Sequence, residues 1–130
     1  MIALDTNLLA RLLLRDDAAQ HARVTTLLQG DQVFTAPVTV LLELVWVLEA
    51  NDCAPADIER GLTMLLGLAN FKPQCADALR SALPSYGQGM DFADALHLAL
   101  CASDDAFMTF DKAFVRKAAK SRSRPPVTAG

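Results

Sequence analysis

The sequence has 130 residues, of which 52% are hydrophobic and 21% are charged. This length and composition suit one folded domain and exclude intrinsic disorder for most of the chain. Acids and turn residues interrupt the apolar stretches too often for a transmembrane helix, and the first residues lack the basic region of a secretion signal. We therefore predict a single domain over residues 1–130, in the cytoplasm and without a membrane segment.

Charge is distributed unevenly along the chain, although the formal net charge is only −3. Residues 1–111 hold all 15 acids and six of the 12 basic residues, a net charge of −9. Residues 112–130 hold the other six basic residues and no acid, a net charge of +6. We predict that about residues 121–130 form either a frayed basic tail or an edge strand, because their prolines cannot donate within a sheet.

Alternating short apolar runs and helical periodicities follow one another along the chain. Strands are predicted at residues 2–5, 32–35 and 106–109. Helices are predicted at residues 8–14, 18–28, 39–50, 55–68, 75–83, 91–103 and 112–120. This alternation favours an α/β fold with parallel strands, in which ligands bind at the carboxyl ends of the strands.

Single residues set several of the predicted boundaries. Gly30 ends the second helix, and Pro37 fits the first turn of the third. Pro84 is predicted to stop the fifth helix, with residues 86–89 as a loop. Asp111 is predicted to cap the last helix. The cysteines Cys53, Cys75 and Cys101 form no CxxC pair, and we interpret them as buried thiols of a reducing compartment.

Four carboxylates stand where acids are unexpected. Glu43 is the only polar residue in nine, at residues 40–48, on a helix whose apolar character predicts burial. Asp94 lies on an apolar helix within a polar stripe formed with Asp91 and His97. Asp5 and Asp111 follow two of the predicted strands, at the edge where parallel sheets place their sites.

Each of these acids has a simpler interpretation when it is taken alone. A strand-end Asp is often a helix cap, and an acid in an apolar helix often pairs with a base at a dimer contact. If the four converge, however, two carboxylates about 4 Å apart repel by about 4 kcal/mol at an effective dielectric of about 20, so the group needs a cation. Oxygen ligands favour Mg²⁺ or Mn²⁺, whereas zinc held by Glu43, Asp94 and His97 is a weaker alternative. Such an ion suits phosphodiester hydrolysis.

The residues just named, in this order, resemble a known family. Leu4-Asp5-Thr6-Asn7, Glu43 about forty residues later, Asp91-Phe-Ala-Asp94 and Thr109-Phe-Asp111 resemble the PIN domain, in the form of the VapC-type toxins of bacterial toxin–antitoxin pairs. The resemblance covers essentially the whole chain. It implies a three-layer α/β/α sandwich with a mostly parallel central sheet, and a Mg²⁺- or Mn²⁺-dependent endoribonuclease that cleaves RNA with metal-activated water.

The resemblance also implies a role for each matching position. The metal-binding and catalytic acids would be Asp5, Glu43, Asp94 and Asp111, with Asp5 and Asp94 as direct ligands. The supporting residues would be Thr6, Asn7, Asp91 and Thr109. The implied partners are an RNA substrate, a second copy of the chain in a homodimer, and a VapB-type antitoxin that inhibits the enzyme. An antitoxin arginine would replace the missing cation at the acids.

Basic and aromatic residues supply weaker candidates. The possible RNA contacts are Arg11, Arg15, Lys112, Arg116 and Lys120. The last three share one helix face by i+4 spacing, although a solvated face is the simpler interpretation. Trp46 fits a buried core or dimer contact better than a base-stacking role. His97 fits a hydrogen-bonded histidine better than a proton relay.

Two other functions remain open on the sequence alone. One is another α/β phosphohydrolase with Asp5 as the nucleophile, although the common DxDx[TV] pattern would need an acid where Asn7 stands. The other is a non-catalytic PIN-like interaction module, against which the complete set of four acids argues. No glycine-rich phosphate loop and no Ser–His–Asp arrangement is present in the sequence.

Overall fold

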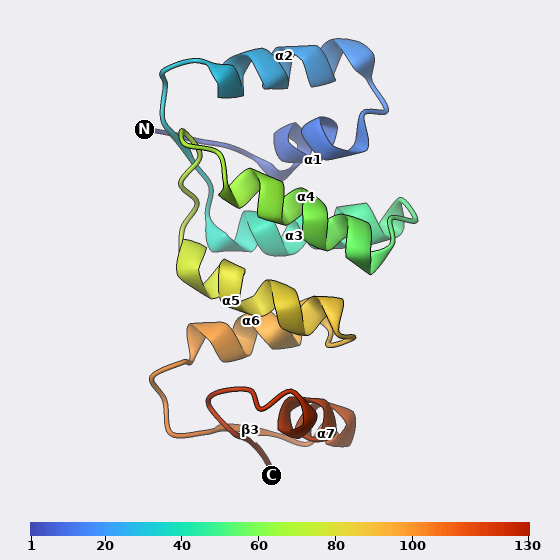
Figure 1. The fold of residues 1–130 in the computed structure, drawn as a ribbon, viewed down its shortest axis with the longest axis vertical. Helices are drawn as coiled ribbons and strands as arrows, with labels where there is room; N and C mark the ends of the chain where they lie inside the picture. Colours follow the sequence, from blue (N-terminus) through green and yellow to red (C-terminus); the bar gives the residue numbers. More distant parts are fainter. The chain divides into compact units, whose positions relative to one another are not determined.

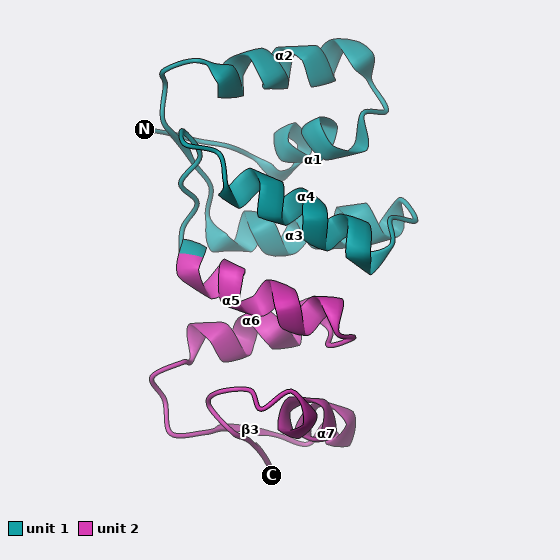
Figure 2. Cartoon of the chain, in the orientation of Figure 1, with its two compact units in different colours: residues 1–76 teal, residues 77–130 magenta.

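The computed structural model describes residues 1–130 as seven helices and four short strands (Figure 1). The chain forms two compact units, residues 1–76 and residues 77–130, which are coloured separately in Figure 2. None of the helices has the length and apolar character that crossing a membrane requires.

The first unit contains two strands and four helices. They are β1 (Ile2–Ala3), α1 (Thr6–Leu14), α2 (Ala18–Gln29), β2 (Phe34–Thr35), α3 (Val38–Ala50) and α4 (Pro55–Leu66). β1 and β2 pair in parallel, with Ile2 opposite Phe34 and Ala3 opposite Thr35. α1 packs against both α2 and α3, and α3 packs against α4.

The core of the first unit is made by aliphatic side chains of α1, α3 and α4. Leu9, Leu41, Leu44, Val45 and Leu65 are all fully buried. Leu41, Leu44, Val45 and Leu48 recur at helical spacing on α3, so this helix has one continuous buried face. Burial of this face leaves the opposite side of α3, which includes Glu43 and Trp46, exposed to solvent.

The second unit contains α5 (Ala76–Gly87) from its second residue onward, α6 (Phe92–Leu100), β3 (Phe107–Thr109), α7 (Lys112–Lys120) and β4 (Val127–Ala129). β3 and β4 pair in parallel, with Phe107 opposite Val127. The ring centroids of Tyr86 and Phe92 lie 5.5 Å apart, edge to face, and join the end of α5 to the start of α6. α7 packs against both strands of this unit.

The predicted α/β fold with parallel strands is confirmed, and the hydrogen bonds arrange the strands as one parallel pair in each unit. The predicted caps are also found: Gly30 ends α2, and Asp111 accepts a hydrogen bond from the Phe114 backbone N–H at 3.1 Å. Pro37 lies one position earlier than predicted, as the residue that precedes α3. Of the two alternatives for the last residues, a strand is what the structure contains at residues 127–129.

The prediction that Pro84 stops a helix is wrong. α5 continues through Pro84 to Gly87, so Tyr86 is helical and not part of a loop. Pro84 itself is exposed, whereas Leu83 and Tyr86 on either side are buried. Continuing the helix brings the Tyr86 ring onto Phe92, and burial of this apolar surface offsets the local cost of the proline.

Truncation of the buried face of α3 is expected to destabilise the protein. Leu44 has no exposed surface, so Leu44→Ala should lower the free energy of unfolding by about 2–5 kcal/mol through lost transfer energy and a residual cavity. Thr39→Ala, at an exposed position on the same helix, should change it by less than about 0.5 kcal/mol. Urea denaturation measures both; equal effects would contradict the packing of α3.

Candidate metal-binding and catalytic site

Thr6 connects two of the predicted acids in the first unit. Its backbone N–H donates to Asp5 Oδ1 at 2.8 Å, and its hydroxyl donates to Glu43 Oε2 at 3.0 Å. Thr6 is the first residue of α1 and is 5% exposed, the only buried polar residue of the chain. Because Thr6 is held in the core, it fixes two carboxylates that lie 38 positions apart in the sequence. The predicted supporting position thus makes direct contact with two predicted site acids.

Glu43 is exposed, so the prediction that it is a buried carboxylate is wrong. The apolar run at residues 40–48 hid the orientation of α3, because both of its faces carry hydrophobic residues. Trp46, one turn later, is 56% exposed, which excludes the core role predicted for it. The outward side of α3 therefore presents a carboxylate and an indole ring to solvent, and the carboxylate is oriented by Thr6.

A cavity of about 360 Å³ borders Asp5 between α1 and α2. Asn7 and Arg11 line it from α1, and Gln20 and Arg23 line it from α2. Arg11 is held by Asp16 at 2.6 and 2.7 Å, and the hydrogen bond and charge of Asp16 raise the pKa of this guanidinium. Arg23 makes no ion pair, so it is the cation of this cavity with its charge uncompensated.

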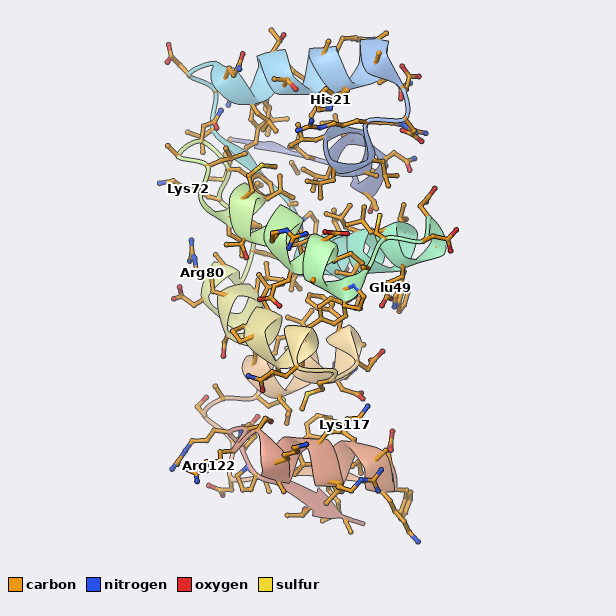
Figure 3. All side chains as sticks on the ribbon, turned by 45° about the vertical axis from the view of Figure 1, so that its right-hand side comes forward. His21, Glu49, Lys72, Arg80, Lys117 and Arg122 are labelled. Carbon is orange, nitrogen blue, oxygen red and sulfur yellow. The ribbon has the colours of Figure 1, made fainter.

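Helix α2 closes this side of the first unit. His21 lies over α1, with Nδ1 3.2 Å from the Arg11 carbonyl oxygen (Figure 3). Sequence reasoning did not select Arg23, because α2 has no polar stripe or motif that marks one of its residues. Its significance comes from the packing of α2 beside Asp5.

Three carboxylates interact electrostatically in the second unit. Burial raises the pKa of Asp94 most, and the negative charges of Asp91 and Asp111 raise it further. His97 and Lys117 act in the opposite direction. Asp91 caps α6 by accepting from the Asp94 backbone N–H at 3.2 Å, so it lies one turn from Asp94 at the start of that helix. This agrees with the predicted position of Asp91 at a helix N-terminus.

The remaining predicted positions of the second unit are placed by β3 and α6. The Thr109 hydroxyl accepts from the Asp111 backbone N–H at 3.1 Å and so positions the residue that begins α7. The His97 ring stacks on Phe107 with centroids 6.2 Å apart and planes 8° apart. This aromatic packing, rather than the predicted hydrogen bonding, is the contact of the His97 ring. The three cysteines are free thiols, partly or fully exposed, which corrects their prediction as core residues.

The donor chemistry of both units fits a hard divalent cation. Asp5 and Glu43 in one unit and Asp94 and Asp111 in the other offer only carboxylate oxygens, the ligands that Mg²⁺ and Mn²⁺ prefer. In neither unit do three or more His, Cys, Asp or Glu side chains gather closely enough to hold a metal ion. Burial first, and then the negative charges of Asp91 and Asp111, raise the pKa of Asp94, and a cation bound beside it would favour its ionised form.

Five basic residues were predicted as possible RNA contacts, and they differ in their surroundings. Arg15 ends α1 with a left-handed backbone (φ 55°) and does not line the cavity beside Asp5. Lys112 and Arg116 lie on the exposed surface of α7. Lys120 instead lines a cavity together with Lys117, which the i+4 pattern did not select. The i+3 spacing of these two lysines places them on neighbouring turns of α7.

Asp94→Asn is expected to change the pH dependence of stability in metal-free protein. The folded-state pKa of Asp94 is raised, so its contribution to stability is fully present below the ordinary value of 3.8. That contribution is lost as the pH rises through the raised folded value, because folding then costs the ionised carboxylate its solvation. The melting temperature of the Asn variant, relative to the wild type, should therefore rise across this interval.

Thermal melts in EDTA over a series of pH values measure this difference. Asp105→Asn is the matched control, because Asp105 is an exposed acid of the same unit. A difference between wild type and Asp94→Asn that is flat with pH, or that falls as the pH rises, would contradict the electrostatic account of this site.

One protein family matches most of this chain. The PIN domain family matches residues 2–120, which include both units' candidate acids and end with α7. No curated protein matches the chain. Because the family match extends over far more than half of the sequence, the chain belongs to the PIN domain family.

Proposed function

We propose that this protein is a Mg²⁺- or Mn²⁺-dependent endoribonuclease. PIN domains are generally metal-dependent nucleases, and this chain belongs to that family. The observation that carries the proposal is the pair of hydrogen bonds by which buried Thr6 holds Asp5 and Glu43. Asp5 also caps α1, but each of the two carboxylates accepts from Thr6 through one oxygen only, which leaves its second oxygen for a cation.

The proposed metal-binding and catalytic acids are Asp5, Glu43, Asp94 and Asp111, with Asp5 and Asp94 as direct ligands. When bound, a divalent ion supplies a water of lowered pKa and neutralises charge on the phosphoryl oxygens. The chain's own residues would bind this ion and orient the carboxylates around it. Thr6 sets the direction of two carboxylates, and Thr109 positions Asp111 through its backbone N–H.

The cavity of the first unit supplies an approach for substrate beside Asp5. Arg23 carries an uncompensated positive charge there, and Asn7 and Gln20 offer amide donors. A phosphate oxygen that entered this cavity could accept hydrogen bonds from these donors beside Asp5, one of the proposed metal ligands. Arg11, held by Asp16, is a weaker candidate for this contact than the sequence suggested, because its charge is already paired.

We further propose the VapC-type role for this nuclease, which is that of a cytoplasmic toxin paired with a VapB-type antitoxin. The family resemblance supports this role, and so does the chemistry of the acids. A site of carboxylates can be blocked by a guanidinium that takes the place of the cation. Homodimerisation belongs to the same proposal, and the exposed Trp46 is a residue whose apolar surface a second copy could cover.

Metal-dependent cleavage of RNA is the direct test of this function. The purified chain, freed of any bound partner, should cut pooled cellular RNA with Mg²⁺ or Mn²⁺ and not with EDTA. Asp94→Asn should reduce the rate by at least about 100-fold, because it removes a negative ligand at the reacting centre. Asp105→Asn, an exposed acid of the same unit outside the proposed site, should retain the wild-type rate.

Each alternative result has a definite meaning. Cleavage that persists in EDTA would contradict the metal mechanism. No cleavage, together with no metal binding by calorimetry, would contradict the nuclease and favour an interaction module. A stable aspartyl-phosphate mimic bound at Asp5 would favour a phosphohydrolase instead.

Thr6→Val is expected to impair the site through Glu43. It removes the hydroxyl donor while nearly preserving side-chain volume, so the concentration of Mn²⁺ needed for half-maximal cleavage should rise about 10–100-fold. Thr6→Ser keeps the donor and should restore wild-type metal dependence even if it lowers the melting temperature. A Thr6→Val enzyme with an altered melting temperature but unchanged metal dependence would show that Thr6 is structural only.

A further inference from the structure

The second unit contains a cavity whose lining has the chemistry of an anion site. It encloses about 500 Å³ and is lined by Lys117 and Lys120 of α7 and by Ser85, Gln88 and Gly89 around the end of α5. No acid lines it. The lining therefore includes two lysines, a serine and a glutamine, whose side chains can donate hydrogen bonds, together with the apolar Met90.

Lys117 is held in place before any ligand arrives. Its Nζ donates to the Gly89 carbonyl oxygen at 3.1 Å, 28 positions away in the sequence. Gly89 has φ +107°, a conformation that other residues rarely adopt, so the turn after α5 depends on this glycine. Figure 3 shows Lys117 projecting from α7. One bond to a carbonyl leaves two ammonium donors for a ligand.

Lys120 completes the cavity without such a restraint. Its side chain makes no ion pair, and it lies in the last turn of α7, where a cation is favoured by the helix dipole. Two lysines at one cavity repel each other unless an anion lies between them. The arrangement is therefore suited to a group with at least one full negative charge and several acceptor oxygens.

The position of the cavity along α7 relates it to the acids of the same unit. Asp111 begins the helix, and Lys117 and Lys120 follow six and nine residues later. At 1.5 Å per residue these are advances of about 9 and about 13 Å along the helix axis. This separation along α7 favours a neighbouring phosphate of the same strand over the phosphate that reacts near Asp111.

We propose that this cavity is a subsite for a backbone phosphate of single-stranded RNA, next to but distinct from the phosphate that reacts. The inference rests on the proposed function, because it takes RNA as the substrate. Lys117 and Lys120 bind the phosphate oxygens as point charges, and Ser85 and Gln88 donate hydrogen bonds. The subsite contributes affinity and register and carries no base specificity.

RNA binding without cleavage tests the subsite. The full chain is titrated in EDTA into a fluorescently labelled single-stranded RNA, and anisotropy gives the dissociation constant over a range of salt concentrations. Each neutralised phosphate contributes about 0.7 to the slope of log affinity against log salt for single strands. Replacing both lysines by Gln should therefore lower the magnitude of this slope by about 0.7, and Lys120→Gln alone should lower it by a part of that amount. Lys117→Gln should do the same, although it also removes the bond to Gly89.

Lys72→Gln is the matched control, because it removes one charge from an exposed lysine that lines neither cavity. Its slope should equal that of the wild type. Equal slopes for Lys120→Gln and wild type would overturn the proposal, and so would equal losses in the Lys120 and Lys72 variants. If Lys120→Gln weakens binding of an acidic peptide but not of RNA, the cavity is a protein-docking site and the proposal fails.

Failure of the subsite and failure of the proposed function give different results. Cleavage of the same RNA by wild type with Mn²⁺ reports on the proposed function alone. Cleavage with unchanged salt slopes would reject the subsite and keep the nuclease. A lowered slope without cleavage would keep the RNA subsite and reject the nuclease.

Discussion

The hydroxyl of Thr6 connects the core of the first unit to its surface chemistry. Thr6 is buried at the start of α1, and its two hydrogen bonds reach Asp5 beside it and Glu43 on α3. A buried hydroxyl needs a partner, because desolvation without one is costly. The packing of α1 on α3 therefore has to bring an acceptor to Thr6, and the acceptor is a carboxylate with a second oxygen that Thr6 does not use.

The second unit organises its acids differently. Asp91 and Asp111 each cap a helix, so each carboxylate faces backbone N–H groups at a helix N-terminus. Such caps stabilise negative charge at a fixed position. Asp94 lies one turn inside α6. Burial raises its pKa most, and the negative charges of the two capping carboxylates raise it further. The unit thus concentrates negative charge where a hard cation would be favourable.

Positive charge in the same unit is placed by tertiary packing rather than by composition alone. The sequence has six basic residues after residue 111, and composition alone does not distinguish among them. Only Lys117 and Lys120 meet the end of α5 across a cavity, because the turn at Gly89 lies against α7. Lys117 also opposes the rise in the pKa of Asp94, so the basic cavity and the acids influence each other electrostatically within this unit. In the proposed nuclease, such neighbouring charges of opposite sign would serve a cation and a polyanionic substrate.

The sequence by itself determined the order of the strands and helices, the parallel pairing of the strands, and the helix caps at Gly30 and Asp111. These depend on local preferences and periodicity, which short segments express without their neighbours. Only tertiary structure decided that Glu43 and Trp46 face outward and that α5 continues through Pro84. An apolar helix does not reveal which face is buried until another helix covers it. Tertiary structure also decided the lysine cavity and the position of Arg23 beside Asp5. Each brings together residues from different segments of the chain, and no periodic sequence pattern connects those segments.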